Sequence, residues 1–323
     1  MCTFRMALLI NKVTNRKVQM DYCTKNGIEK IGDKTGELRT DHHLVSPTAK
    51  LVAHFRRYTD ISYSEEIARR IDAQGLASKL AGGDEILHGL SSWLAPYLEA
   101  RYKCIGSQLE REGYRNVMEL AAGIAPRGFV MARDPDVTYV DTDLGGILDE
   151  REALFKELGI QKRPNHYFHK VNVLSLDDLE GASRYFEGKL FAVIHEGLLP
   201  YLIREEKQAM ARNIHSILKP QDGIYVTPDV VTKTRYKAMI DGNPSVADLF
   251  AAISGVTARD MVDNAFEDWE DAVRFYQQSG FSIDRRPYYD GTYELSSIGR
   301  LKSDTERVMA MIRPREVWVM RAK

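Results

Sequence analysis

Small residues follow an acid in the segment NVMELAAGIAPRG, which covers positions 116–128. Glu119 stands near the end of a short apolar run, and Ala121, Ala122 and Gly123 come directly after that run. Residues with little or no side chain leave the backbone of a turn accessible, so a ligand can lie against its N–H groups at the start of a helix. Three classes of ligand are bound at such a turn: dinucleotides, phosphates and S-adenosylmethionine.

The residues of the turn argue against the first two classes. The dinucleotide pattern GxGxxG requires glycine where this chain has Ala121 and Ile124. A phosphate-binding P-loop requires a Gly-Lys-Ser/Thr sequence, and none follows the turn. Glu119 has no favourable role beside a pyrophosphate, whereas a carboxylate attracts the ammonium group of an amino acid in a partly desolvated turn. These residues therefore predict S-adenosylmethionine as the cofactor.

A second acid ends the next apolar run, at Asp141 or Asp143. A carboxylate at this position can accept hydrogen bonds from the 2′ and 3′ hydroxyls of a ribose. Residues two apart in a strand share a face, so both aspartates can point toward the ligand. Of the two, we favour Asp143 as the ribose ligand.

Alternating strands and helices must position these residues. Short buried strands are predicted at 116–120, 137–144, 166–174, 190–197 and 223–229, and helices at 148–160 and 205–218. Residues 125–132 have room for a turn and a helix. This alternation predicts βαβ units on a parallel sheet, with the strand ends and the ligand at one edge. A helix at 268–280, strands at 281–289 and 316–322, and a helix-like segment at 303–312 complete the predicted core.

Further helical segments flank the predicted sheet. Helices are expected within 46–60, 62–71 and 91–112, the last ended by Gly113, and residues 231–265 are interpreted as an irregular helical insertion over the ligand edge. Residues 11–41 are polar and show no period, which is typical of a mobile leader. The predicted division is a leader (1–45), a helical cap (46–112), a cofactor-binding core (113–230), a lid insertion (231–265) and the closing part of the core (266–323).

The composition limits the partners. Of the 323 residues, 44% are apolar and 28% charged, which is ordinary for a globular protein. The formal net charge of −1 gives no basic field for nucleic acid or an anionic membrane. Three scattered cysteines (Cys2, Cys23 and Cys104) suit a reducing compartment, and no apolar run approaches the roughly 20 residues of a membrane span. Without a signal-peptide cleavage site, a cytoplasmic protein is expected. The oligomeric state is left open.

Four motifs in order resemble a known family. ELAAGIAPRG, YVDTDL, HEGLLPYL and GIYVTPD are similar to motifs of the leucine carboxyl methyltransferase superfamily, in particular its bacterial branch of polyketide-type O-methyltransferases. The segment SPTAKLVAHFRRYTDISYSEEIA resembles the helical start of that branch, so the likeness runs from about Ser46 to Asp229. It implies a Rossmann-like class I methyltransferase: an α/β fold with a seven-strand sheet whose last strand is antiparallel, and S-adenosyl-L-methionine as cofactor.

The resemblance also implies roles for individual residues. Arg101 would pair with the methionine carboxylate, the turn from Glu119 to Gly123 would hold the methionine side, and Asp143 would hold the ribose. The full set of cofactor residues that it implies is Arg101, Glu119, Ala121, Gly123, Asp143, Leu144, Asn172, Val173, Glu196 and Gly197, with Asn172 and Val173 beside the adenine. Two positions depart from the family pattern, which commonly has glycine where Ala121 stands and aspartate where Asn172 stands.

His195 and Tyr201 are the nearest candidates to act as a base or to position the methyl acceptor, although His195 also suits a purely structural hydrogen-bonded role. A metalloprotease pattern HExxH fails because Leu199 occupies its last position. His166 and His169 lack a second pair of ligands nearby, so no metal is predicted.

Two kinds of acceptor are compatible with these residues. A carboxylate needs no general base at neutral pH, whereas a phenol benefits from one. The resemblance favours a carboxylate of a small molecule or peptide, with Arg204, Lys233 and Arg235 as cationic partners near the active edge. The alternatives are a hydroxyl O-methyltransferase of polyketide-type metabolites, a non-catalytic S-adenosyl-ligand-binding protein, and, less favoured because of the missing glycines, a nicotinamide dehydrogenase.

Overall fold

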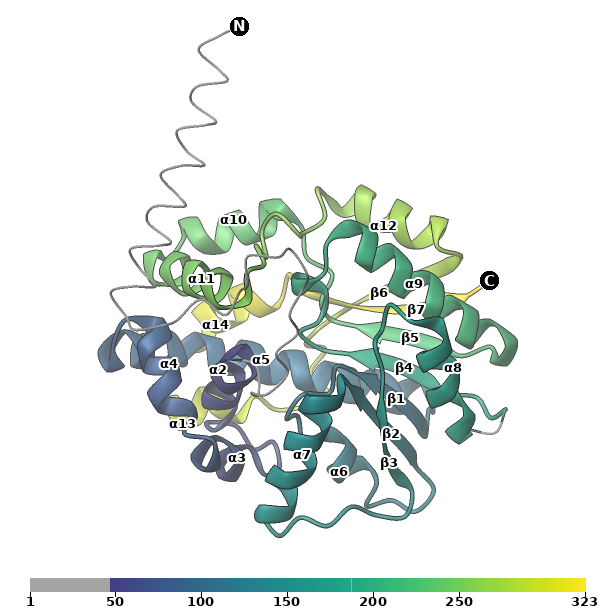
Figure 1. Ribbon diagram of the computed structural model, residues 1–323. Helices are drawn as coiled ribbons and strands as arrows, with labels where there is room; N and C mark the ends of the chain where they lie inside the picture. The colour runs from purple at the N-terminus through teal and green to yellow at the C-terminus, as the bar shows by residue number, and fades with distance from the viewer. Residues whose placement is uncertain (1–46, 187) are drawn as a thin grey trace, which may run out of the picture.

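The protein was analysed as a computed structural model that describes residues 47–186 and 188–323. Within these residues, seven strands form one sheet in the order β3-β2-β1-β4-β5-β7-β6 (Figure 1). The predicted leader, 1–45, lies outside the described residues. The strands are β1 (Asn116–Leu120), β2 (Thr138–Asp143), β3 (His166–Lys170), β4 (Ala192–His195), β5 (Ile224–Thr227), β6 (Phe281–Pro287) and β7 (Glu316–Ala322).

Strands β1 to β5 are parallel to their neighbours, and β7 runs antiparallel to both β5 and β6. This confirms the predicted α/β fold class, including its antiparallel last strand. β1 lies between β2 and β4, so the direction in which successive strands are added reverses beside β1. A crevice opens outside the carboxyl ends of the strands at such a switch point, and ligands of open α/β sheets bind there.

Helices cover both faces of the sheet. Met118 of β1 packs on one side with helices α8 (Leu176–Ser183), α9 (Arg204–Leu218) and α12 (Trp269–Gln278). The neighbouring Val117 points to the other side, which α5 (Asp84–Glu112) and α14 (Thr305–Ile312) cover. This alternation follows from the two-residue period of a strand. Both side chains have no exposed surface, and full burial of an apolar side chain stabilises the fold by roughly 1.5–3 kcal/mol.

The helical cap differs in part from the prediction. It consists of α2 (Pro47–Arg56), α3 (Ser64–Arg70), α4 (Ala73–Ala81) and α5. Helix α4 was not predicted, and α5 begins at Asp84 instead of residue 91, because its first turns bury Leu87 and Leu90 against the cap. Gly113, with φ of 70°, ends α5 as predicted.

The region predicted as a lid contains α10 (Lys233–Asp241) and α11 (Pro244–Thr257). Leu80 of α4, Leu94 of α5 and Ile253 of α11 are buried in one cluster, so this region packs directly on the cap. Figure 1 shows α2, α4, α5, α10 and α11 together at one end of the molecule, on the left in the view. The remaining helices are α6 (Arg127–Met131), α7 (Gly145–Glu157) and α13 (Ser296–Leu301). None of the helices in the described ranges is both long and apolar enough to span a bilayer.

Candidate functional site

The turn after β1 has a left-handed backbone, and its N–H groups at Ala122 and Gly123 are hydrogen-bonded within the protein. Ala121 and Gly123 have φ values of 50° and 51°, in the left-handed region. Ala122 N–H donates to the carbonyl of Thr142 at 3.0 Å, which ties the turn to β2. Alanine adopts this conformation at some cost, whereas glycine adopts it freely. The chain therefore forms the turn even with alanine where the family commonly has glycine.

Asp143 connects this turn to the end of β2. Its carboxylate accepts one hydrogen bond from Gly123 N–H and another from Leu144 N–H, each at 2.8 Å. Leu144 is the residue that precedes α7. The side chain of Asp143 is nearly buried, and this burial raises its pKa to about 6, although the two N–H groups act in the opposite direction.

Asp141, the alternative to Asp143, lies deeper in the protein. Its carboxylate is fully buried and contacts Arg151 at 2.7 Å and His166 at 2.6 Å. Burial opposes the ionisation of Asp141, but the charge of Arg151 and the hydrogen bond with His166 outweigh it and lower its pKa. The geometry thus gives Asp141 a structural ion pair and leaves Asp143 as the acid at the edge of the sheet.

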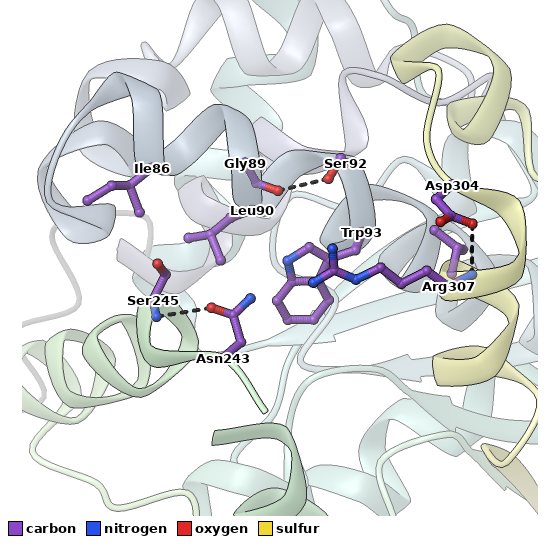
Figure 2. A pocket seen from close by; sticks show the side chains of 10 residues that line it. Ile86, Gly89, Leu90, Ser92, Trp93, Asn243, Ser245, Asp304 and Arg307 are labelled. Carbon is purple, nitrogen blue, oxygen red and sulfur yellow. Dashed lines mark hydrogen bonds between the residues drawn. The ribbon is translucent and has the colours of Figure 1, made fainter. Parts of the chain in front are cut away.

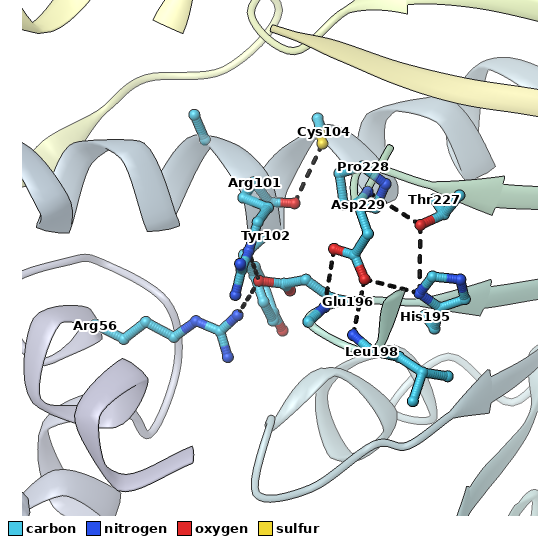
Figure 3. Close-up of polar contacts among 12 residues, drawn as sticks. Arg56, Arg101, Tyr102, Cys104, His195, Glu196, Leu198, Thr227, Pro228 and Asp229 are labelled. Carbon is cyan, nitrogen blue, oxygen red and sulfur yellow. Dashed lines mark hydrogen bonds and ion pairs between the residues drawn. The ribbon is translucent and has the colours of Figure 1, made fainter. Parts of the chain in front are cut away.

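A cluster of buried charges surrounds Glu196 at the end of β4 (Figure 3). Its carboxylate accepts hydrogen bonds from Arg101 Nε at 2.8 Å and Arg127 Nη2 at 3.2 Å, and it also forms an ion pair with Arg56. Burial opposes the ionisation of Glu196, but the positive charges of Arg56, Arg101 and Arg127 dominate and lower its pKa. Glu196 is therefore ionised at neutral pH.

Glu119 belongs to the same cluster. Its carboxylate contacts Arg127 Nε at 3.3 Å and accepts a hydrogen bond from the hydroxyl of Tyr139 at 2.6 Å. Counted with Glu196, the cluster holds two carboxylates and the three guanidinium groups of Arg56, Arg101 and Arg127. Among the described residues these two carboxylates are the ones in direct contact with the three guanidinium groups, while Asp229 acts on Arg101 through its charge, so the direct contacts leave guanidinium donors for a ligand anion. A ligand carboxylate suits this position.

Arg56 and Arg127 are site residues that the sequence analysis missed. Arg127 comes from α6 and lies 3.8 Å from the centre of the Tyr102 ring. Arg56 is the last residue of α2 and meets Glu196 across 140 positions of sequence. Both residues stand inside motifs that carry the family resemblance. The only available signal was therefore the presence of an arginine within APRG and HFRRYTD.

His195 lies beneath the cluster without any exposed surface. Its Nδ1 is hydrogen-bonded to Asp229 Oδ2 at 3.0 Å, and its Nε2 to the hydroxyl of Tyr225. Asp229 also accepts hydrogen bonds from Gly197 N–H at 2.9 Å and Leu198 N–H at 2.8 Å (Figure 3). Burial opposes ionisation of Asp229, but its hydrogen bond with His195 prevails and lowers its pKa to about 2. His195 thus helps to fix the backbone after β4.

The other predicted residues lie around the same edge. The chain after β3 is bonded to β2 through Val171 N–H and the carbonyl of Asp143, at 2.9 Å, so Asn172 and Val173 follow close to Asp143. Asn172 Oδ1 accepts from Leu174 N–H at 3.0 Å and shapes this loop. Tyr201, in the turn Leu199–Tyr201, is hydrogen-bonded to Thr48 of α2, and burial raises its pKa.

Two cavities lie near the cap. A cavity of about 320 Å³ opens between α5, α11 and α14, where Trp93, Asn243 and Arg307 line it (Figure 2). None of the predicted site residues belongs to its lining. A second cavity, of about 10 Å³, lies beside Asp229 and Tyr236. The second cavity is thus too small to hold an acceptor in this conformation.

No protein-family model and no curated protein sequence matches this chain. Among solved structures, a DUF574 family protein from Streptomyces avermitilis is similar to it with a TM-score of 0.53 and 12% identity, covering 86% of this chain and 98% of the other. A candidate methyltransferase from Thermobifida fusca is similar with a TM-score of 0.50 and 14% identity, covering 90% and 100%. At these identities the likeness concerns the fold.

Proposed function

We propose that this protein is an S-adenosylmethionine-dependent O-methyltransferase whose acceptor is a carboxylate of a small molecule or peptide. The observation that carries the proposal is the pairing of two features on adjacent strands. The turn after β1 is tied to Asp143, and a cationic cluster lies at the ends of β1 and β4. A ligand with a ribose at one end and an amino acid at the other matches both features.

The residues present fit the cofactor group by group. Asp143 has carboxylate lone pairs beyond those used by Gly123 and Leu144, so it can accept hydrogen bonds from the ribose hydroxyls. Arg101 and Arg56 supply the excess positive charge for the methionine carboxylate. The ionised Glu196 offers a negative partner for the ammonium group. The left-handed turn at 121–123 provides a surface without bulky side chains between the two ends.

Methyl transfer requires the protein mainly to align the acceptor oxygen with the methyl group. S-adenosylmethionine supplies an activated methyl group on a sulfonium. An oxygen lone pair of the acceptor forms the new C–O bond while the C–S bond breaks, and the sulfonium becomes a neutral thioether. An ionised carboxylate has no proton to lose, so the step is balanced without a base. The chain then contributes by orienting the two reactants and by excluding water.

The surroundings of His195 support a carboxylate acceptor over a hydroxyl. A general base must reach the proton that it removes, but both ring nitrogens of His195 already have partners and the ring is fully buried. We therefore propose that His195 positions the loop from Gly197 to Leu198 through Asp229. We also propose that Tyr201, next to this loop, faces the acceptor.

The product distinguishes the functions. Purified protein with methyl-labelled S-adenosylmethionine should transfer label to members of a panel of carboxylic acids, and mild base should release the label as methanol. A matched panel of phenols and alcohols serves as the comparison. Label in a base-stable product would contradict the carboxylate assignment and favour a hydroxyl O-methyltransferase. Tight S-adenosylhomocysteine binding without transfer to any extract component would instead favour a non-catalytic binding protein.

A further inference from the structure

Arg315, in the turn between α14 and β7, is a buried cation without a carboxylate partner among the described residues. It is 5% exposed, and its Nε atom has no hydrogen-bond partner. Its guanidinium lies 5.1 Å from the centre of the Tyr97 ring, and Nη2 contacts the sulfur of Met239. A thioether is a weak acceptor, so these contacts do not replace a counter-ion. A buried charge in this situation is strongly disfavoured unless an anion joins it.

A second arginine, Arg235, lies one helical turn before Met239, the α10 residue that Arg315 contacts. Arg235 of α10 is partly buried, and burial together with the positive charge of Arg315 lowers its pKa. Within residues 47–186 and 188–323, no carboxylate pairs with Arg235 either. The other two cations predicted as acceptor partners are neutralised, since Arg204 pairs with Asp271 at 2.8 Å and Lys233 pairs with Glu267. Of these three predicted cations, Arg235 alone lacks a carboxylate partner among the described residues.

Tyrosine side chains connect this arginine pair to the cofactor cluster. Tyr97 and Tyr288 are stacked with ring centres 6.3 Å apart. Tyr97 lies one helical turn before Arg101 on α5. Tyr236, next to Arg235 on α10, lines the small cavity beside Pro200 and Asp229. The arginine pair therefore lies between α10, through Met239, and the α5 segment that carries Tyr97 and Arg101. Figure 1 shows both helices on the cap side of the sheet.

We propose that Arg315 and Arg235 bind a carboxylate of the methyl acceptor, with the ring of Tyr97 as a flat wall for the body of that acceptor. This inference rests on the proposed function, because it assigns the substrate class of the same site. Guanidinium groups match carboxylates geometrically through paired N–H donors, and aromatic rings pack against planar groups at little entropic cost. Asp229 forms no ion pair with either arginine in the described part of the chain, and its oxygens accept hydrogen bonds from His195 and from the N–H groups of Gly197 and Leu198.

The test uses simple acids beside their neutral isosteres. Benzoate, phenylacetate and hexanoate are each compared with the corresponding carboxamide, on protein saturated with S-adenosylhomocysteine, by saturation-transfer NMR and competition. We expect at least one carboxylate to bind about tenfold or more tightly than its amide. Arg315→Met and Arg235→Met should each remove this preference. Arg313→Met, which changes an exposed arginine two positions away, is the matched control and should retain it.

Measurements of the Tm and of the affinity for S-adenosylhomocysteine show whether each variant is folded and still binds the cofactor product. Because Arg315→Met replaces an unpaired buried cation with an apolar side chain of similar length, we expect an unchanged or higher Tm and unchanged affinity for S-adenosylhomocysteine. If no carboxylate is preferred over its amide, or if Arg315→Met keeps the preference, the inference is wrong while the proposed function stands. If wild-type protein does not bind S-adenosylhomocysteine, the proposed function itself fails.

Discussion

The most direct test of the cofactor site is the replacement of Asp143 by asparagine. This change keeps the size of the side chain but leaves only one of the two oxygens that accept from Gly123 N–H and Leu144 N–H, and it removes the charge that strengthens hydrogen bonds from ribose hydroxyls. Hydrogen bonds to a charged group contribute about 1.5–3 kcal/mol each, so a net loss of about 2 kcal/mol is expected. That corresponds to roughly 30-fold weaker binding of S-adenosylhomocysteine.

The raised pKa of Asp143 adds a pH dependence with a defined sign. Burial raises this pKa to about 6 in the folded protein, whereas an unperturbed aspartate titrates near 4. The protonated form is thus favoured by folding, and Asp143 destabilises the free protein as the pH rises from about 4 to about 6. The ribose hydroxyls instead favour the ionised form, so affinity should fall as the pH falls through 6. The ionised fraction drops from about 0.9 at pH 7 to about 0.1 at pH 5, which predicts roughly tenfold weaker binding.

Isothermal titration with S-adenosylhomocysteine from pH 5 to pH 8, at constant ionic strength, measures both effects. Asp143→Asn should bind weakly and lose the pH dependence between 5 and 7. Asp149→Asn is the matched control, because Asp149 is an exposed residue of α7 whose partner Lys170 is also exposed. An affinity that does not change between pH 5 and pH 7 in the wild type, or a normal affinity in Asp143→Asn, would refute the assignment of Asp143 to the ribose.

Three further variants test separate parts of the argument. Arg101→Ala should weaken the binding of S-adenosylhomocysteine by about 3 kcal/mol, near 100-fold, and leave the binding of adenosine almost unaffected, since adenosine lacks the carboxylate. Calorimetry with both ligands measures the two affinities. Equal losses would show that Arg101 has a structural role. His195→Asn should lower the Tm, because it leaves buried hydrogen-bonding partners unsatisfied at a cost of about 1–3 kcal/mol of unfolding free energy. The rate of methyl transfer should stay independent of pH from pH 6 to 9. A wild-type rate that rises with pH, and a variant rate that does not, would instead identify His195 as a base. Ala121→Gly should raise the unfolding free energy by about 0.5 kcal/mol, because the relief of left-handed backbone strain exceeds the larger loss of chain entropy that glycine suffers on folding. Calorimetric unfolding measures this change. A lower Tm would count against strain at this turn.

The centre of the sheet was predictable because β1, β4 and β5 are short, mostly apolar runs that are fully or almost fully buried. The acids Glu119 and Asp143 were found for a similar reason, since each lies at or near the end of a short apolar run. The helices that were not predicted, such as α4 and α8, are not set off from their flanking residues by a clear change in composition. Gly82 and Gly83, both with positive φ, separate α4 from α5 and give this stretch the composition of a loop. Helix α8 has only eight residues, and its N-cap Ser175 was the one clear local signal.

The cations of the site could not be predicted in the same way. Arg56 and Glu196 are brought together across the chain by packing of the cap, and Arg315 meets Tyr97 only because α5 crosses the sheet beside β7. The sequence pattern around an arginine is the same whether it faces solvent or a buried carboxylate. Arginine side chains are mostly exposed in proteins, so an arginine on a helix is expected to face solvent. The three-dimensional structure was therefore needed to show that Arg204 pairs with Asp271, 67 positions away, and that Arg235 has no carboxylate partner among the described residues.

The division into cap, core and lid remains a prediction, but the contacts connect the cap closely to the site. Helix α2 contributes Arg56 to the Glu196 cluster and Thr48 to the hydrogen bond with Tyr201. It therefore contacts both the cofactor side and the acceptor side of the same crevice. An anion bound between Arg56 and Arg101 would balance the excess charge and hold α2 against the end of β4. Under the proposed function, the helix beside the bound cofactor would be the same one that supports Tyr201, so occupation of the cofactor site would also organise the surface on which the acceptor binds.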